Sequence, residues 1–152
     1  MGEGSTPYFL KKLCELTSIE HEEIWATKFW GRDNPYHKVR VYPLGLMATV
    51  LEKELKGKVF DLILIDNDKT DRVNPAQGAF GRSDIIVWHD TQNPIYGFNK
   101  VTVPGDYKMV VFNFSPAHTS VFVKSKELFD KLLYFSQLIN QYKDCYNKLS
   151  EI

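Results

Sequence analysis

The sequence has few cysteines, no long apolar run and no excess of either charge. Its two cysteines, Cys14 and Cys145, lie far apart and lack the spacing of metal ligands, so we expect no disulfide framework and a cytoplasmic protein with free thiols. No apolar run approaches about 18 residues, and the amino terminus lacks a charged segment followed by an apolar core, so we expect neither membrane insertion nor secretion. Lysine plus arginine and aspartate plus glutamate both number 19, and this balance gives no clear nucleic-acid signal.

The length of 152 residues and the hydrophobic content of 43% are typical of one globular domain, residues 1–152. Apolar periodicity and turn residues predict helices and strands in alternation. Helices are expected at 8–15, 22–29, 46–55 and from 125 onward, and strands at 16–20, 38–44, 59–65 and 84–91. An antiparallel hairpin is expected at 107–114 and 119–123. Residues 69–83 leave room for only a short or irregular helix, and 92–106 for a long loop.

The most informative feature is a pair of apolar runs that each end in acid. One run ends in Asp66-Asn67-Asp68 and the other in His89-Asp90. Such runs indicate strands buried on both faces of a parallel sheet, and ligands bind at the carboxyl ends of these strands. We therefore expect Asp66, Asp68, His89 and Asp90 to mark a functional site. Alternatively, Asp66 and Asp90 accept hydrogen bonds in the turns that follow the strands.

Motifs near the amino terminus resemble those of class I S-adenosylmethionine-dependent methyltransferases. Gly2-Glu3-Gly4, just before a predicted helix, resembles the second half of the family's glycine-rich loop, where backbone must approach the cofactor closely. Glu20 ends the next predicted strand and resembles the acid that accepts hydrogen bonds from the cofactor's ribose. The resemblance implies that Gly2, Gly4, Glu20 and Asp66 bind S-adenosylmethionine. His21 would line the adenosine pocket or be a solvated turn residue.

The acidic strand ends carry the resemblance further. Asp66-Asn67-Asp68 is similar to the Asp-Gly-Asp, and Val87-Trp88-His89-Asp90 to the Phe-His-Asp, of a small-molecule subgroup of that family. The resemblance implies an α/β fold, a Rossmann-like three-layer sandwich. It also implies a mostly parallel sheet, a carboxyl-terminal antiparallel hairpin and a long final helix. The implied activity is O-methylation of a small molecule or sugar.

The chain departs from the family because it begins inside the glycine loop. The first strand, which normally occupies the middle of the sheet, is therefore missing, and two facing rows of backbone groups would lack partners. Three explanations stay open. The chain is the carboxyl-terminal part of a longer protein, neighbouring strands close the gap, or another chain supplies the strand.

Methyl transfer to a hydroxyl needs a base, and His89 is the candidate because imidazole titrates near pH 6.5. A structural, hydrogen-bonded role for His89 is the alternative. Asp66, Asp90 and Asn93 could hold Mg²⁺, which favours hard oxygen ligands. Asp68 and Tyr96 are candidates for substrate contact.

Two other function classes stay open. One is a truncated or degenerate Rossmann-like module that binds or assembles without catalysis, and the other is a nicotinamide-dependent oxidoreductase. The final helix carries an apolar stripe that indicates core packing or a subunit contact of a homo-oligomer, formed by Leu128, Leu132, Phe135, Ile139, Tyr142, Tyr146 and Leu149.

Overall fold

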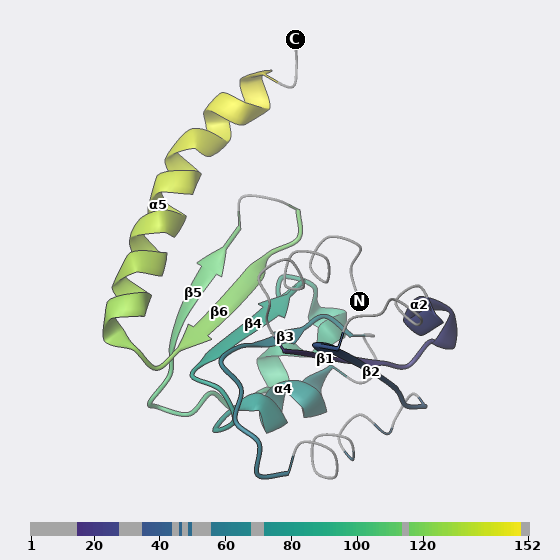
Figure 1. Cartoon of the computed structure of the whole chain (residues 1–152). Helices are drawn as coiled ribbons and strands as arrows, with labels where there is room; N and C mark the ends of the chain where they lie inside the picture. The colour runs from purple at the N-terminus through teal and green to yellow at the C-terminus, as the bar shows by residue number, and fades with distance from the viewer. Residues whose placement is uncertain are drawn as a thin grey trace.

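The structure is a computed structural model that describes residues 15–27, 35–43, 46, 49, 56–67, 72–113 and 116–149 (Figure 1). A first sheet of two parallel strands pairs β1 (Leu16–Glu20) with β2 (His37–Val41), and the short helix α2 (Glu23–Thr27) follows β1. The strand predicted at 16–20 is confirmed. The predicted strand at 38–44 is present in shorter form, and the predicted helix at 22–29 is present over 23–27, with residues 28 and 29 outside the described part.

A second sheet has four strands in the order β3-β4-β6-β5. β3 (Ile63–Ile65) and β4 (Ile85–His89) are parallel, whereas β6 (Thr119–Val123) is antiparallel to both β4 and β5 (Lys108–Phe112). The predicted parallel pair and antiparallel hairpin are confirmed, and so is the α/β class. The four-stranded sheet is mixed, so the expectation of a mostly parallel sheet holds only for part of it.

Within the described residues, the two sheets are not joined by hydrogen bonds between strands. β1 pairs only with β2, and β3 pairs only with β4 among the strands that the structure describes. Of the three explanations for the missing strand, closure of the gap by neighbouring strands is therefore not observed in the described residues. The break lies between the sheet that ends in Glu20 and the sheet that carries the acidic strand ends.

The expectation that β3 and β4 are buried on both faces is wrong. Leu64 is 39% exposed, and only one face of β4 is fully covered, through Ile86 and Trp88. Side chains alternate between the two faces of a strand, and α4 (Val73–Ala79) covers one face of this pair. The apolar run that suggested a doubly covered strand therefore leaves part of its surface open to solvent. β3 is also shorter than predicted, although Phe60 still forms an isolated bridge with Ser83.

The core lies between the four-stranded sheet and α4, the short helix expected in 69–83. Its buried members are Ile65, Ala76, Ala79, Ile86, Trp88, Tyr107 and Phe122. Trp88 is completely buried and meets Phe98 edge-on, with ring centroids 5.2 Å apart. Burying each large apolar side chain contributes roughly 1.5–3 kcal/mol, so this cluster anchors β4 firmly in the sheet.

The long helix α5 (Lys126–Leu149) packs on the opposite face of the sheet. The hydroxyl of Ser125 accepts a hydrogen bond from Leu128 N, which caps the start of the helix. Phe112 contacts Phe135, with ring centroids 6.3 Å apart. Because Phe112 pairs across the sheet with Thr119 and Thr119 with His89, Phe112 lies on the face away from Trp88. Helices thus cover both faces of the sheet.

The segment 92–106, predicted as a long loop, contains two short 3₁₀ helices, η2 (Pro94–Tyr96) and η3 (Phe98–Lys100). Gly97 joins them with a φ of 69°, which a side chain rarely tolerates. The predicted helix at 8–15 and most of the one at 46–55 lie outside the described residues. In the described part of the chain, no helix combines the length and apolarity needed to cross a membrane.

Candidate functional site at the ends of β3 and β4

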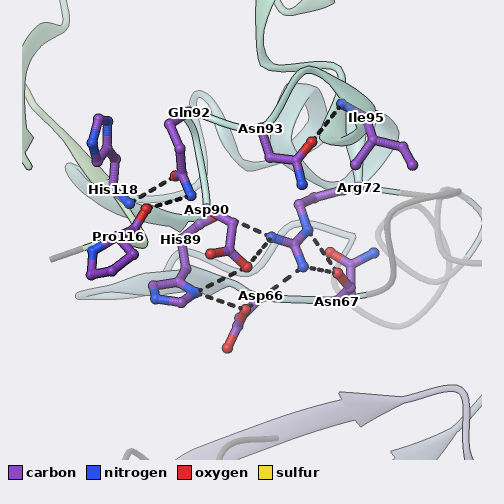
Figure 2. Close-up of polar contacts among 10 residues, drawn as sticks. All are labelled: Asp66, Asn67, Arg72, His89, Asp90, Gln92, Asn93, Ile95, Pro116 and His118. Atoms are coloured by element: carbon purple, nitrogen blue, oxygen red, sulfur yellow. Dashed lines mark hydrogen bonds and ion pairs between the residues drawn. The ribbon is translucent and has the colours of Figure 1, made fainter.

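The register of two parallel strands brings the predicted site residues together. Ile65 of β3 lies beside Trp88 of β4, so the residues that follow, Asp66 and His89, are also neighbours. His89 Nδ1 lies 3.3 Å from Asp66 Oδ1 and 3.4 Å from Asp90 Oδ2 (Figure 2). The expected convergence of the acidic strand ends is therefore observed. One imidazole nitrogen lies between two carboxylates.

Asp90 adopts a backbone conformation that is rare for a residue with a side chain. Its φ is 62°, the only positive φ among the described residues other than glycine. The left-handed region costs roughly 1–2 kcal/mol for most residues, and aspartate tolerates it better than most. Its carbonyl accepts a hydrogen bond from Asn93 N, so the chain turns sharply after β4. Strained backbone of this kind clusters at functional sites.

A buried arginine connects the two strand ends, and sequence reasoning missed it. Arg72 is 4% exposed and precedes α4. Its Nη1 donates to the carbonyl of His89 at 2.8 Å, and its Nε donates to the carbonyl of Asn67 at 2.7 Å, while Nη2 also bonds that second carbonyl. The guanidinium therefore fixes the backbone at the end of both strands (Figure 2).

The same guanidinium also balances the acids. Arg72 Nη2 lies 3.7 Å from Asp66 Oδ1, and Nη1 lies 3.8 Å from Asp90 Oδ2. Two carboxylates, one guanidinium and a neutral imidazole carry a net charge of −1, which a proton on the imidazole would cancel. The cluster can therefore accept a proton or a cationic group.

Tyr96 lies directly against this cluster. Arg72 Cζ is 3.9 Å from the centroid of the Tyr96 ring, within the range of a cation–π interaction. Such a contact contributes about 0.5–2 kcal/mol, depending on how far it is shielded from water. The loop residue predicted to contact substrate thus lies next to the acidic strand ends, although its own contact is with the arginine.

Neighbouring residues meet only part of the hydrogen-bonding capacity of the His89 imidazole. Both carboxylate contacts are longer than a normal N–H···O hydrogen bond of about 2.9 Å, and Nδ1 has no well-aligned hydrogen-bond partner. Nε2 is the ring nitrogen directed away from both acids (Figure 2). The arrangement can therefore hold the imidazole through one nitrogen while the other meets a bound molecule.

The cluster offers ligand atoms for a metal ion, with one obstacle. Asp66, His89 and Asp90 each provide one atom, and these atoms lie within 4.8 Å of one another. Arg72, however, pairs with both carboxylates and would compete with a cation. The side chain of Asn93, in the set predicted for Mg²⁺, accepts a hydrogen bond from Ile95 N at 3.1 Å. The donor set thus fits a divalent ion only if Arg72 withdraws from the acids.

The hairpin loop is fastened beside the site by Gln92. Its Nε2 donates to the carbonyl of Pro116 at 2.8 Å, and its Oε1 accepts from His118 N at 2.7 Å (Figure 2). Thr91 N also donates to the carbonyl of His118 at 3.1 Å. These contacts tie the loop after β4 to the turn between β5 and β6. Gln92 is the second residue that sequence reasoning missed.

Glu20 and His21 lie at the end of β1, in the other sheet. The Glu20 carboxylate is almost fully buried, and its Oε1 accepts hydrogen bonds from the backbone N–H groups of His21, at 2.8 Å, and Glu22, at 3.4 Å. Burial alone would raise the pKa of Glu20, but the hydrogen bonds that the carboxylate accepts, including these two, lower it below 4.5. His21 Nδ1 lies 3.1 Å from the same oxygen. A charged, buried carboxylate is thus held at this strand end.

The structure brings together Asp66, His89, Asp90 and Tyr96 of the predicted site residues. Gly2, Gly4 and Asp68 lie outside the described residues. The sequence contains one indication of the role of Arg72, because this cationic residue lies in the connection between two strands that are each followed by acidic residues. The sequence contains no indication of the role of Gln92, because polar residues are common in loops.

Comparisons with known proteins do not assign the chain to a family. No protein-family model matches the chain, and a search of curated proteins gives no significant match.

Proposed function

We propose that the chain is an S-adenosylmethionine-dependent methyltransferase-like domain that methylates a hydroxyl group of a small molecule or sugar. The observation that carries the proposal is the convergence of Asp66, His89 and Asp90 at the carboxyl ends of two neighbouring parallel strands. In open α/β sheets this edge is where ligands bind. Two of the motifs that resemble the methyltransferase family, those that contain Asp66 and His89-Asp90, lie at the same strand ends.

The arrangement of elements supports the proposal at the level of the fold. Parallel strands followed by an antiparallel hairpin, with α4 on one face and α5 on the other, are consistent with a Rossmann-like three-layer sandwich. The antiparallel hairpin also favours a methyltransferase over a nicotinamide-dependent oxidoreductase, the other class that shares a glycine loop and a ribose acid.

His89 would act as the general base. In methyl transfer to a hydroxyl, the new carbon–oxygen bond forms as the carbon–sulfur bond breaks, and the hydroxyl proton passes to a base. Nδ1 of His89 lies between two carboxylates, so Nε2 is the atom that accepts this proton. Asp66 and Asp90 would hold the ring and stabilise its protonated form. A positioned base of this kind typically contributes about 10²–10⁴-fold to the rate.

S-adenosylmethionine would supply the methyl group. Glu20 is the described residue whose environment fits it, because its buried carboxylate is held in the ionised form that accepts hydrogen bonds from ribose hydroxyls. Asp66 and His21 are the other described candidates, and Gly2 and Gly4 complete the proposed set. Mg²⁺ at Asp66 and Asp90, with Asn93, is a further proposal, and Arg72 must then move.

The direct test is isothermal titration of the protein with S-adenosylmethionine. We expect micromolar binding that Glu20→Ala abolishes. Glu15→Ala, at an exposed position just before β1, is the matched control and should bind normally. The absence of heat at millimolar cofactor would contradict the proposal. Titration with NAD in parallel tests the oxidoreductase alternative.

Once an acceptor is found, His89→Ala tests the base. Turnover should fall about 100-fold or more while cofactor affinity stays nearly unchanged. Equal turnover in the variant would remove His89 from the mechanism. Chelation followed by addition of Mg²⁺ tests the metal proposal in the same assay, because a rate insensitive to chelator argues against it.

A non-catalytic module is the second candidate, and the break between the two sheets favours it. The strand ends at Glu20 and at Asp66 belong to separate hydrogen-bonded sheets. A cofactor that needs both would depend on how firmly the sheets are held together. Failure to bind S-adenosylmethionine, with the fold intact, is the result expected of this candidate.

A further inference from the structure

The apolar stripe of α5 follows a stricter repeat than contact with a sheet requires. Successive members, from Leu128 to Leu149, are alternately four and three residues apart over the whole helix. An average spacing of about 3.5 residues is the period of a coiled-coil seam, in which one helix packs along another. The repeat is therefore typical of a helix that packs along a second helix.

The sheet occupies only part of this helix. α5 has 24 residues and is about 36 Å long, whereas β5 has five residues and spans about 17 Å. Contacts with the sheet come from the first half, where Ser136 donates to the carbonyl of Val111 and Lys108 lies over the ring of Phe129. The carboxyl end of α5 extends past the strands (Figure 1).

Aromatic side chains of α5 are largely open to solvent, although Phe135 also contacts Phe112 of β5. Tyr134 is 67% exposed, Phe135 53% and Tyr142 62%. Phe135 and Tyr142 belong to the heptad stripe, whereas Tyr134 lies about 100° around the helix from Phe135 and outside the stripe. One aromatic side chain can bury about 150–250 Å², so Phe135 and Tyr142 expose roughly 230 Å² of mostly apolar surface at seam positions. The sheet therefore leaves part of the seam uncovered.

We propose that this stripe binds the same stripe of a second copy of the chain, so that the protein forms a homodimer through antiparallel α5 helices. The heptad repeat decides for this occupant, because two copies of one stripe have the same spacing. A stable interface buries about 800 Å² per partner, of which about 450 Å² is apolar. Phe135 and Tyr142 supply about half of that apolar area, and the partly buried Leu138 and Ile139 adjoin them.

The charges of α5 are compatible with self-pairing. Lys126 pairs with Asp130 and Lys131 with Glu127, each at 2.6 Å within the same helix. These pairs neutralise the charged residues at the start of α5, so a second copy would meet no excess of like charge there. Antiparallel pairing about a two-fold axis also places the two globular parts at opposite ends of the helix pair.

The experiment is sedimentation equilibrium of the full chain over about 1–200 µM. We expect a monomer–dimer equilibrium in the micromolar range. Tyr142→Glu should weaken the dimer at least about 30-fold, because it places a charge in both copies of the seam. Gln137→Glu adds the same charge at an exposed position on the opposite side of α5 and should change the dissociation constant less than about threefold.

Circular dichroism and thermal unfolding check that both variants are folded, and the exposure of Tyr142 makes loss of the fold unexpected. A monomer at every concentration would overturn the proposal. So would a dimer that Tyr142→Glu leaves intact, because another surface would then form it, or one that both variants weaken equally. None of these outcomes bears on S-adenosylmethionine binding, so the two proposals can fail separately.

Discussion

Arg72 donates a hydrogen bond of 2.8 Å to the main-chain carbonyl of His89, the residue that ends β4. The same side chain bonds the carbonyl of Asn67, just after β3. The buried guanidinium therefore holds the ends of β3 and β4 close enough together for the side chains of Asp66 and His89 to meet. The position of His89 relative to Asp66 depends on a residue that contributes no atom to the proposed chemistry.

Replacing Arg72 with methionine should destabilise the protein by about 2–4 kcal/mol, because two carbonyl groups lose their donor and two carboxylates lose their counter-charge. Urea denaturation measures the loss. Arg40→Met, at an exposed position of β2, is the control and should change the free energy of unfolding by less than about 0.5 kcal/mol. Equal effects would show that Arg72 is not the link between the strands.

Gly97→Ala should cost about 1–3 kcal/mol of stability. A Cβ at this position would lie 2.6 Å from Cγ2 of Val73, and the φ of 69° is strained for alanine. Gly105→Ala is the matched control, since a Cβ there meets nothing within 4 Å. The Val73→Ala background should recover part of the cost by removing the clash. Chemical denaturation of wild type, the three single variants and the double variant tests this, and an unchanged cost in the Val73→Ala background would attribute the effect to backbone strain alone.

Tyr107→Phe should destabilise the fold by about 1–3 kcal/mol, because it removes a hydroxyl that links the start of the hairpin to the turn before β4. That hydroxyl donates to the carbonyl of Ser83 at 2.6 Å and accepts from Gly81 N at 3.0 Å. Tyr134→Phe removes an exposed hydroxyl and should be nearly neutral. Thermal unfolding compares the two, and similar melting temperatures would contradict the assignment.

Glu20→Gln should destabilise the protein more at pH 7 than at about pH 3. The pKa of Glu20 lies below its ordinary value of 4.5 in the folded state, so the unfolded chain takes up the proton first as the pH falls. The stabilisation is therefore present above about pH 4.5 and is lost as the pH falls through the lower, folded pKa. We expect a cost of about 1–2 kcal/mol at pH 7.

Urea denaturation of wild type and Glu20→Gln at both pH values measures this difference. Glu15→Gln controls for the loss of one negative charge at the same end of the chain. A cost that is the same at both pH values would show that the Glu20 carboxylate does not contribute through its charge.

Local pattern predicted several elements well, and tertiary contacts explain what it missed. β1 and β6 have the predicted bounds, and β6 is delimited in the sequence by Pro116 before it and Ser125 after it. The convergence of Asp66 with His89 was predictable, since parallel strands end at the same edge. The role of Arg72 was not, because it depends on the register between β3 and β4. β3 is shorter and more exposed than its apolar run suggested, since composition does not reveal which face another element covers.

β4 places two very different side chains next to each other in the chain. Trp88 is completely buried in the core, and His89 points to the opposite face, where the acids lie. A shift in pairing by a single residue would exchange these faces, with the indole in water and an imidazole in the apolar interior. A shifted register of β4 would therefore destabilise the fold. In a correctly folded chain, His89, the proposed catalytic base, already faces the acids.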